Sequence, residues 1–155
     1  MSSPVAASIL IVEDDEFKLT DILEFLEAEV PQAAKRTAQS VGQAIIAINE
    51  EKFDLIILDM ALPNQVATLG GAQPLSLPTG GVEVLLELDY LDRSDGVFIL
   101  TQYPEIQYDG ASVGVSKARK KLSASIGCNI LAAEIFDPAS HRWNTKIREV
   151  LNGVG

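Results

Sequence analysis

Three short, uninterrupted runs of apolar residues limit the folds that this chain can adopt. They lie within SILIV at 8–12, DLIIL at 54–58 and GVFIL at 96–100. A continuous apolar run without strict alternation is typical of a strand that is covered on both faces. Such strands form parallel sheets with helices packed on either side, so the runs favour an α/β fold.

Stretches with helical periodicity separate these strands. Leu19, Ile22, Leu23 and Leu26 follow the spacing of one helix face, and we expect this helix to end near Pro31. The same spacing and two weaker strand patterns complete the series, with helices expected at 41–48 (after an N-cap at Ser40), 82–89, 115–122 and 143–151, and strands at 33–38 and 129–133. The alternation predicts one domain over residues 1–155, built around a parallel sheet.

Composition excludes several classes of function. Twelve basic side chains against 22 acidic ones give a net charge of −10, which argues against binding to nucleic acids and to anionic membranes. The single cysteine, Cys128, excludes an internal disulfide and a thiolate zinc site. The start of the chain has no basic region, and its apolar run is too short for a signal or membrane segment. We therefore expect a soluble, cytoplasmic domain.

Two stretches interrupt the alternation. Residues 64–81 are rich in glycine and proline and have no periodicity, and residues 102–114 form a second irregular segment. Both are predicted to be long loops that follow the carboxyl end of a strand, where open α/β sheets bind ligands. They are either passive connections or parts of a binding surface.

Acidic residues follow the first and third strands. The first strand ends in VEDD, which contains Glu13, Asp14 and Asp15, and the third ends at Asp59. Neighbouring carboxylates repel one another unless a cation lies between them, and oxygen ligands without histidine or cysteine suit Mg²⁺. Asp15 is the best candidate to cap the following helix instead. The alternative is that these acids merely mark where the strands meet water.

The fourth strand, FILTQ, ends on the hydroxyl of Thr101, which is expected to lie beside Asp59. A carboxylate nucleophile, a divalent metal and a hydroxyl donor are the groups needed to accept a phosphoryl group and respond to it. The order and spacing of these residues therefore point towards phosphoryl chemistry.

The motifs ILIVEDDEFKLTDIL, DLIILDMALP, GVEVLLEL, FILT and IFDPAS resemble the receiver domain of two-component response regulators. The resemblance covers nearly the whole chain in the family's order, apart from the two long loops. It implies the flavodoxin-like (βα)5 sandwich, with a parallel sheet of strand order 2-1-3-4-5.

The resemblance also implies roles for individual residues. Asp59 would be the phospho-acceptor, and Thr101 the switch hydroxyl. Mg²⁺ would be held by Glu13, Asp14, Asp59 and the backbone carbonyl of Ala61. The phosphoryl donor would be a histidine kinase or phosphotransfer protein, and the output an altered contact with a downstream protein. Such a domain is not an enzyme beyond its own phosphorylation and dephosphorylation.

The sequence departs from the family at the end of the fifth strand. Family members carry a lysine there that pairs with the phosphoryl group, whereas NILAAEIFDP places Glu134 or Ala133 at that point. A glutamate facing the site would repel a phosphoryl group. The strand also offers only aliphatic side chains in place of the family's aromatic switch residue, for which Tyr103 is a candidate substitute.

Three interpretations follow from the missing lysine. In the first, Asp59 is phosphorylated and Mg²⁺ supplies most of the neutralising charge. In the second, a cation from the basic segment KARKK at 117–121 moves towards Asp59 and pairs with the phosphoryl group. In the third, the domain is a phosphorylation-independent pseudo-receiver that serves as a docking module. An aspartate-based phosphohydrolase is disfavoured because Ala61 lies where such enzymes generally carry a second acid. A nucleotide-binding role lacks both a glycine-rich fingerprint and a P-loop.

Overall fold

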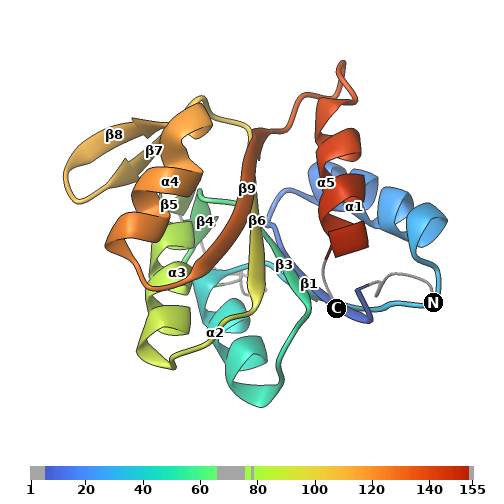
Figure 1. The fold of residues 1–155 in the computed structure, drawn as a ribbon, viewed down its shortest axis with the longest axis horizontal. Helices are drawn as coiled ribbons and strands as arrows, with labels where there is room; N and C mark the ends of the chain where they lie inside the picture. The colour runs from blue at the N-terminus through green and yellow to red at the C-terminus, as the bar shows by residue number, and fades with distance from the viewer. Residues whose placement is uncertain (1–5, 66–75, 78, 154–155) are drawn as a thin grey trace, which may run out of the picture.

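A five-stranded parallel sheet forms the centre of the computed structural model, which describes residues 6–65, 76–77 and 79–153 (Figure 1). The strand order is β2-β1-β3-β6-β9. The strands are β1 (Ser8–Val12), β2 (Ala34–Ala38), β3 (Leu55–Leu58), β6 (Gly96–Thr101) and β9 (Asn129–Ile135). Counted along the chain, the sheet strands have the order 2-1-3-4-5, which confirms the predicted flavodoxin-like α/β fold.

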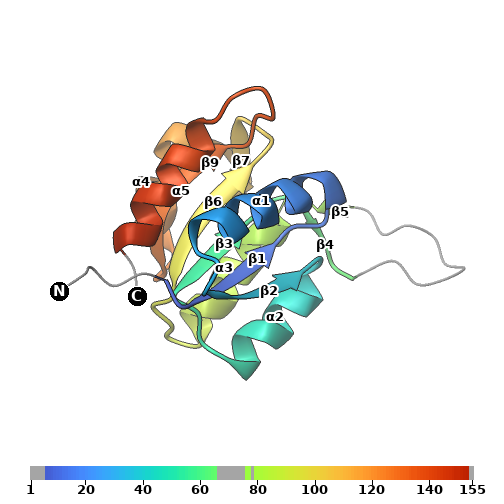
Figure 2. The same cartoon turned by 90° about the vertical axis from the view of Figure 1, so that its right-hand side faces the viewer.

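Helices cover both faces of this sheet (Figures 1 and 2). One face is covered by α1 (Glu16–Glu29) and α5 (Arg142–Gly153), and the other by α2 (Val41–Glu50), α3 (Gly80–Tyr90) and α4 (Val115–Ser125). Within the described ranges, no helix combines the length and the apolar character needed to cross a membrane.

The alternation of side chains along β3 explains why its sequence is continuously apolar. Ile56 and Leu58 pack into the core beneath α2, α3 and α4, whereas Leu55 and Ile57 pack beneath α1 and α5. All four side chains are at most 1% exposed. The strand therefore faces two cores, as the sequence pattern predicted.

Side-chain caps fix the starts of the first two helices. Asp15 accepts a hydrogen bond from the backbone N–H of Lys18 at 3.0 Å, and Ser40 accepts one from Gln43 at 3.1 Å. Both residues were predicted as caps, and both satisfy a backbone donor that the helix leaves unpaired. The cap at Asp15 orients the first turn of α1 directly after the acidic residues.

The prediction that residues 102–114 are irregular was wrong. They contain an antiparallel hairpin of β7 (Glu105–Tyr108) and β8 (Ala111–Gly114), turned by Asp109 with φ 52° and Gly110 with φ 75°. Positive φ at both central residues suits the hairpin turns that Asp-Gly favours. The backbone N–H of Val115 donates to the carbonyl of Pro104 at 2.9 Å and closes the base of this hairpin.

The predicted loop at 64–81 is only partly described. The short strands β4 (Leu62–Pro63) and β5 (Ser76–Leu77) pair antiparallel, and α3 begins at Gly80. The part of this prediction that concerns residues 66–75 and 78 lies outside the described residues.

Arg93 links three segments at the other end of the sheet. Its guanidinium donates to the carbonyls of Ile48 and Glu51 and forms an ion pair with Asp95 at 2.7 Å. Asp95 in turn accepts the backbone N–H of Phe53 at 2.8 Å. The end of α2 is thereby tied to the segments that lead into β3 and β6.

Candidate functional site

The carboxyl ends of β1 and β3 lie side by side and bring the predicted acidic residues together. Val12 is paired with Leu58, so the residues that follow them, Glu13 and Asp59, leave the sheet at the same edge. The backbone N–H of Asp59 donates to the carbonyl of Val12 at 3.0 Å, which fixes this placement.

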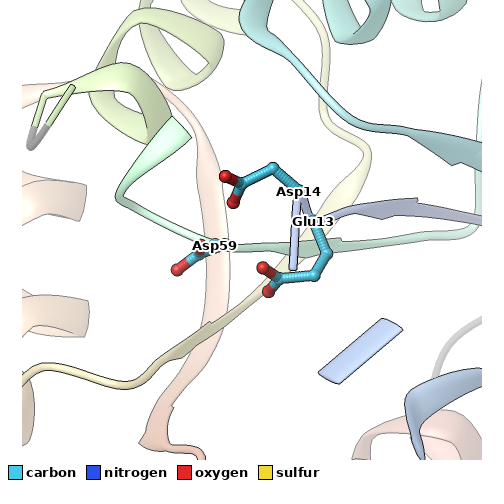
Figure 3. Close-up of side chains that lie close together, drawn as sticks. All are labelled: Glu13, Asp14 and Asp59. Carbon is cyan, nitrogen blue, oxygen red and sulfur yellow. The ribbon is translucent and has the colours of Figure 1, made fainter. Parts of the chain in front are cut away.

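Three carboxylates converge at this edge. Glu13, Asp14 and Asp59 each offer an oxygen atom, and these atoms all lie within 4.8 Å of one another (Figure 3). Glu13 is 2% exposed and Asp59 6%, while Asp14 is more open to solvent. Asp15, by contrast, is used as the cap of α1. The structure therefore brings together the three carboxylates that were predicted to hold a metal.

Burial makes this cluster electrostatically unfavourable on its own. It raises the pKa of Glu13, with the charge of Asp59 adding to the increase and Lys18 opposing it. Burial likewise raises the pKa of Asp59, again against the effect of Lys18, and the neighbouring Asp14 adds to the increase. The charged forms of these groups would be stabilised by additional positive charge.

The donor set fits a hard divalent cation. The three clustered side chains offer only carboxylate oxygens, and Mg²⁺ prefers oxygen ligands and typically retains water molecules. The buried Oδ1 atom of Asp59 accepts no hydrogen bond, so it has a free coordination position. The more exposed Asp14 leaves the cluster open on one side to water.

A buried cation that we did not predict from the sequence lies beside this cluster. Lys18 is 0% exposed, and its Nζ atom lies 2.6 Å from Oε1 of Glu13 and 3.4 Å from Oδ1 of Asp59. It also donates a hydrogen bond to the carbonyl of Leu100 at 2.7 Å. The helical spacing could have predicted its burial, because Lys18 lies four residues before Ile22 and therefore on the buried face of α1.

Thr101 and Ala61 border a cavity of about 390 Å³ next to the cluster. The hairpin strand β7 contributes much of its wall, and the full lining is Met60, Ala61, Thr101, Tyr103, Pro104, Glu105, Ile106 and Gln107. Thr101 is buried, and its hydroxyl accepts the backbone N–H of Tyr103 at 3.3 Å. The predicted switch hydroxyl therefore lies at the wall of this cavity, together with the residues that follow Asp59, while Tyr103 is 55% exposed.

The end of β9 does not add its glutamate to the acidic cluster. Glu134 is paired in the sheet with Leu100 and is not among the three clustered carboxylates of the described residues. Beyond it, the backbone N–H of Phe136 donates to the carbonyl of Thr101 at 2.8 Å. The ring of Phe136 lies with its centroid 5.6 Å from Nζ of Lys18. An aromatic ring therefore lies beside the ammonium group.

The basic residues of α4 lie on an exposed helix face. Lys117, Arg119, Lys120 and Lys121 are all exposed, and Arg119 donates to the carbonyl of Ile130 at 3.3 Å. Ile130 lies near the start of β9, at the opposite end from Thr101. The structure thus gives no support to the interpretation that the basic segment neutralises Asp59.

No family model matches this chain. Sequence comparison does identify relatives, and their alignments cover 92% of this chain. The Detocs response regulatory protein DtcB of Vibrio alginolyticus is 36% identical over 146 residues, which span 92% of this chain and 98% of that protein. The uncharacterized protein y4jS of Sinorhizobium fredii is 35% identical over 147 residues, and the matched region is 31% of its length.

Solved structures share the fold at lower sequence identity. A CheY-like response regulator receiver domain protein from Methanospirillum hungatei has a TM-score of 0.59 at 23% identity, covering 94% of this chain and 93% of its own. The receiver domain of sensor histidine kinase PA1611 from Pseudomonas aeruginosa has a TM-score of 0.57 at 17% identity, covering 99% of both chains. The chain belongs to the response regulators and has the receiver-domain fold of two-component signalling.

Proposed function

We propose that this receiver domain accepts a phosphoryl group on Asp59 from a phosphohistidine in a Mg²⁺-dependent reaction. The donor is a histidine kinase or a phosphotransfer protein, and the phosphorylated domain changes its contact with a downstream protein. The observation that carries this proposal is the cluster of three converging carboxylates, in which the buried Oδ1 atom of Asp59 accepts no hydrogen bond.

The transfer forms one bond and breaks another. The nitrogen–phosphorus bond of the phosphohistidine breaks as phosphorus bonds to a carboxylate oxygen of Asp59. The histidine keeps the electron pair of the broken bond and takes up a proton, so it departs as neutral imidazole. Dephosphorylation is a hydrolysis. An oxygen of water bonds to phosphorus, the bond between Asp59 and phosphorus breaks, and inorganic phosphate and a proton leave.

The residues of this chain hold the acceptor in place for that reaction. The parallel pairing of β1 and β3 places Asp59 beside Glu13 in the folded chain, which favours a preorganised site. Glu13, Asp14, Asp59 and the carbonyl of Ala61 are the proposed ligands of Mg²⁺. When bound, this ion would neutralise the charge on the transferring phosphoryl group.

We assign Thr101 to the response that follows phosphorylation. A hydroxyl can donate to a phosphoryl oxygen, and that of Thr101 lies at the end of the strand next to β3. Its reorientation would alter the cavity it shares with β7, and so the surface that the hairpin presents to a protein partner. The acceptor of the phosphoryl group would be the domain's own aspartate rather than a second molecule.

Descriptions of similar proteins agree with this proposal. The relative from Vibrio alginolyticus is described as a response regulatory protein. The PA1611 receiver domain is described with a magnesium ion coordinated in its active-site cleft. A chain with a TM-score of 0.60 at 16% identity, covering 92% of this chain and 84% of its own, comes from a CheX–CheY–BeF3–Mg²⁺ complex of Borrelia burgdorferi.

The test is intact-mass measurement after incubation with acetyl phosphate and Mg²⁺. We expect the wild type to gain the mass of one acid-labile phosphoryl group, and Asp59→Asn to gain none. Asp54→Asn is the matched control, because Asp54 precedes the same strand at its other end and bonds to the backbone of Ala7 and Ser8. A wild type that gains no mass at saturating donor would contradict the acceptor function.

That negative result would favour the second candidate, a phosphorylation-independent docking module. One observation supports this alternative: Lys18 already pairs with Glu13 and lies near Asp59, so part of the charge of the cluster is balanced without a metal or a phosphoryl group. In that case the hairpin and its cavity would bind a protein in a single, unswitched state.

A further inference from the structure

We propose that Lys18 supplies, from α1, the positive charge that pairs with the phosphoryl group on Asp59. This proposal rests on the proposed acceptor function. It would resolve the difficulty raised by the sequence, in which the fifth sheet strand ends without a lysine. In this chain the cation would come from helix α1 instead of from the fifth sheet strand.

The burial of Lys18 requires an explanation other than packing. Its side chain is 0% exposed and lies on the same helix face as Leu19, Ile22 and Leu26, where an aliphatic residue would pack without loss of hydration. An ammonium group removed from water is unfavourable unless anionic or polar partners surround it. Packing of the core therefore does not explain why position 18 carries a charged side chain.

The contacts of Lys18 place that charge at the acceptor. An ammonium group has three donors, and the carbonyl of Leu100 takes one of them at 2.7 Å. The group lies 2.6 Å from Oε1 of Glu13 and 3.4 Å from Oδ1 of Asp59, and neither oxygen accepts a hydrogen bond of regular geometry. Asp59 is thus close enough for ion pairing, while its oxygen remains free to react.

Phosphorylation would strengthen this pairing. The phosphoryl group adds negative charge and new acceptor oxygens beside Asp59, and charge-assisted hydrogen bonds to such oxygens are stronger than neutral ones. Lys18 has a flexible four-carbon chain that can turn its ammonium towards them. Leu100 precedes Thr101, so the carbonyl that anchors Lys18 belongs to the strand that also carries the switch hydroxyl.

The surroundings of Lys18 provide a spectroscopic signal. The ring of Phe136 lies 5.6 Å from its Nζ atom and 5.4 Å, between ring centroids, from the ring of Trp143. Trp143 is buried at the start of α5 and is the single tryptophan of the sequence. A movement of Lys18 is therefore expected to change the tryptophan fluorescence.

The experiment compares Lys18→Met with Lys18→Arg and Lys35→Met. Lys18→Met keeps the apolar stem and removes the charge, whereas Lys18→Arg keeps the charge. Lys35→Met is the matched control: Lys35 is 11% exposed, pairs with Glu27 at 2.8 Å and donates to the carbonyl of Val30 at 3.0 Å, at the amino end of β2. It also removes a lysine charge from an ion pair, but its partner Glu27 is exposed and the pair lies away from the acceptor.

Two readouts are measured for each folded variant in Mg²⁺. One is the affinity for beryllofluoride, followed by tryptophan fluorescence, and the other is the extent of phosphorylation by acetyl phosphate, followed by intact mass. We expect Lys18→Met to weaken beryllofluoride binding by roughly tenfold or more and to lower phosphorylation, with Lys18→Arg partly restoring both. Lys35→Met should match the wild type.

The outcomes separate the two proposals. If the wild type is phosphorylated and Lys18→Met equals it in both readouts, the role of Lys18 is wrong and the acceptor function stands. If the wild type itself gains no phosphoryl group and binds no beryllofluoride, both proposals are wrong.

A measurement on the wild type covers the case in which Lys18→Met does not fold. The ammonium ¹⁵N resonance of Lys18, assigned by its absence from Lys18→Arg, should shift when beryllofluoride is added. An unchanged resonance in a protein that binds beryllofluoride would overturn the proposal.

Discussion

The ammonium nitrogen of Lys18 lies 2.6 Å from a carboxylate oxygen of Glu13, and both side chains are almost completely buried. Oδ1 of Asp59 lies 3.4 Å from the same ammonium nitrogen. One cation therefore serves two buried carboxylates, and the cluster keeps an excess of negative charge that should appear in the stability of the protein.

Metal-free protein is expected to lose stability as the pH rises from about 4.5 to about 8. Burial raises the pKa of Glu13 from 4.5 to about 8, so the folded state binds more protons than the unfolded state within this window. Asp59 shifts in the same direction. The free energy of unfolding, measured with urea in EDTA, should fall by about 1 kcal/mol or more across the window.

Asp59→Asn provides the control for this pH dependence. It removes the charge that adds to the pKa increase of Glu13, so its stability should fall less steeply over the same range. Mg²⁺ should also reduce the fall in the wild type, because a bound cation favours the charged carboxylates. Equal slopes for the wild type and Asp59→Asn in EDTA would contradict the proposed coupling.

Arg93→Met is expected to destabilise the fold by about 3 kcal/mol, because it leaves the buried Asp95 without its cation and two carbonyls without their donor. Urea unfolding measures this change. Arg36→Met is the matched control, since Arg36 forms more exposed ion pairs with Glu50 and Glu51, and its loss should have little effect. Similar losses in the two variants would refute the importance of burial.

The hairpin turn allows a prediction that separates backbone conformation from packing. A Cβ atom added at Gly110 or at Gly114 would have no heavy-atom neighbour within 4 Å, but only Gly110 has a positive φ, of 75°. We expect Gly110→Ala to cost about 1 kcal/mol and Gly114→Ala to be close to neutral. Thermal unfolding of the two variants tests this, and a larger loss for Gly114→Ala would show that the turn is not the cause.

Much of the fold could be predicted because local patterns and sheet topology agree. The runs ending at Val12 and Leu58 predicted adjacent buried strands, and that adjacency brought Glu13 and Asp59 to one edge. The helix caps at Asp15 and Ser40 were also predicted, because their hydrogen bonds depend on residues nearby in the sequence.

The remaining features depended on contacts between distant segments or on a signal that we overlooked. Asp109 and Gly110 form an Asp-Gly turn signal, yet the flanking segments were interpreted as irregular. The contact of Lys18 with the carbonyl of Leu100 joins residues 82 positions apart, so sequence spacing could not reveal it. Alignment along the fifth strand indicates only that Glu134 replaces the family's lysine. It cannot show that a lysine from α1 reaches the same site.

The backbone hydrogen bond between Val115 and Pro104 has a consequence for how such domains can diversify. This bond holds the two ends of the hairpin close together. The length and composition of the hairpin can therefore vary while β6 and α4 stay in place. Its strand β7 forms part of the wall beside Thr101, whereas the three clustered carboxylates lie on other segments. Changes in the hairpin can therefore alter the surface offered to a partner while the residues of the proposed acceptor site stay unchanged.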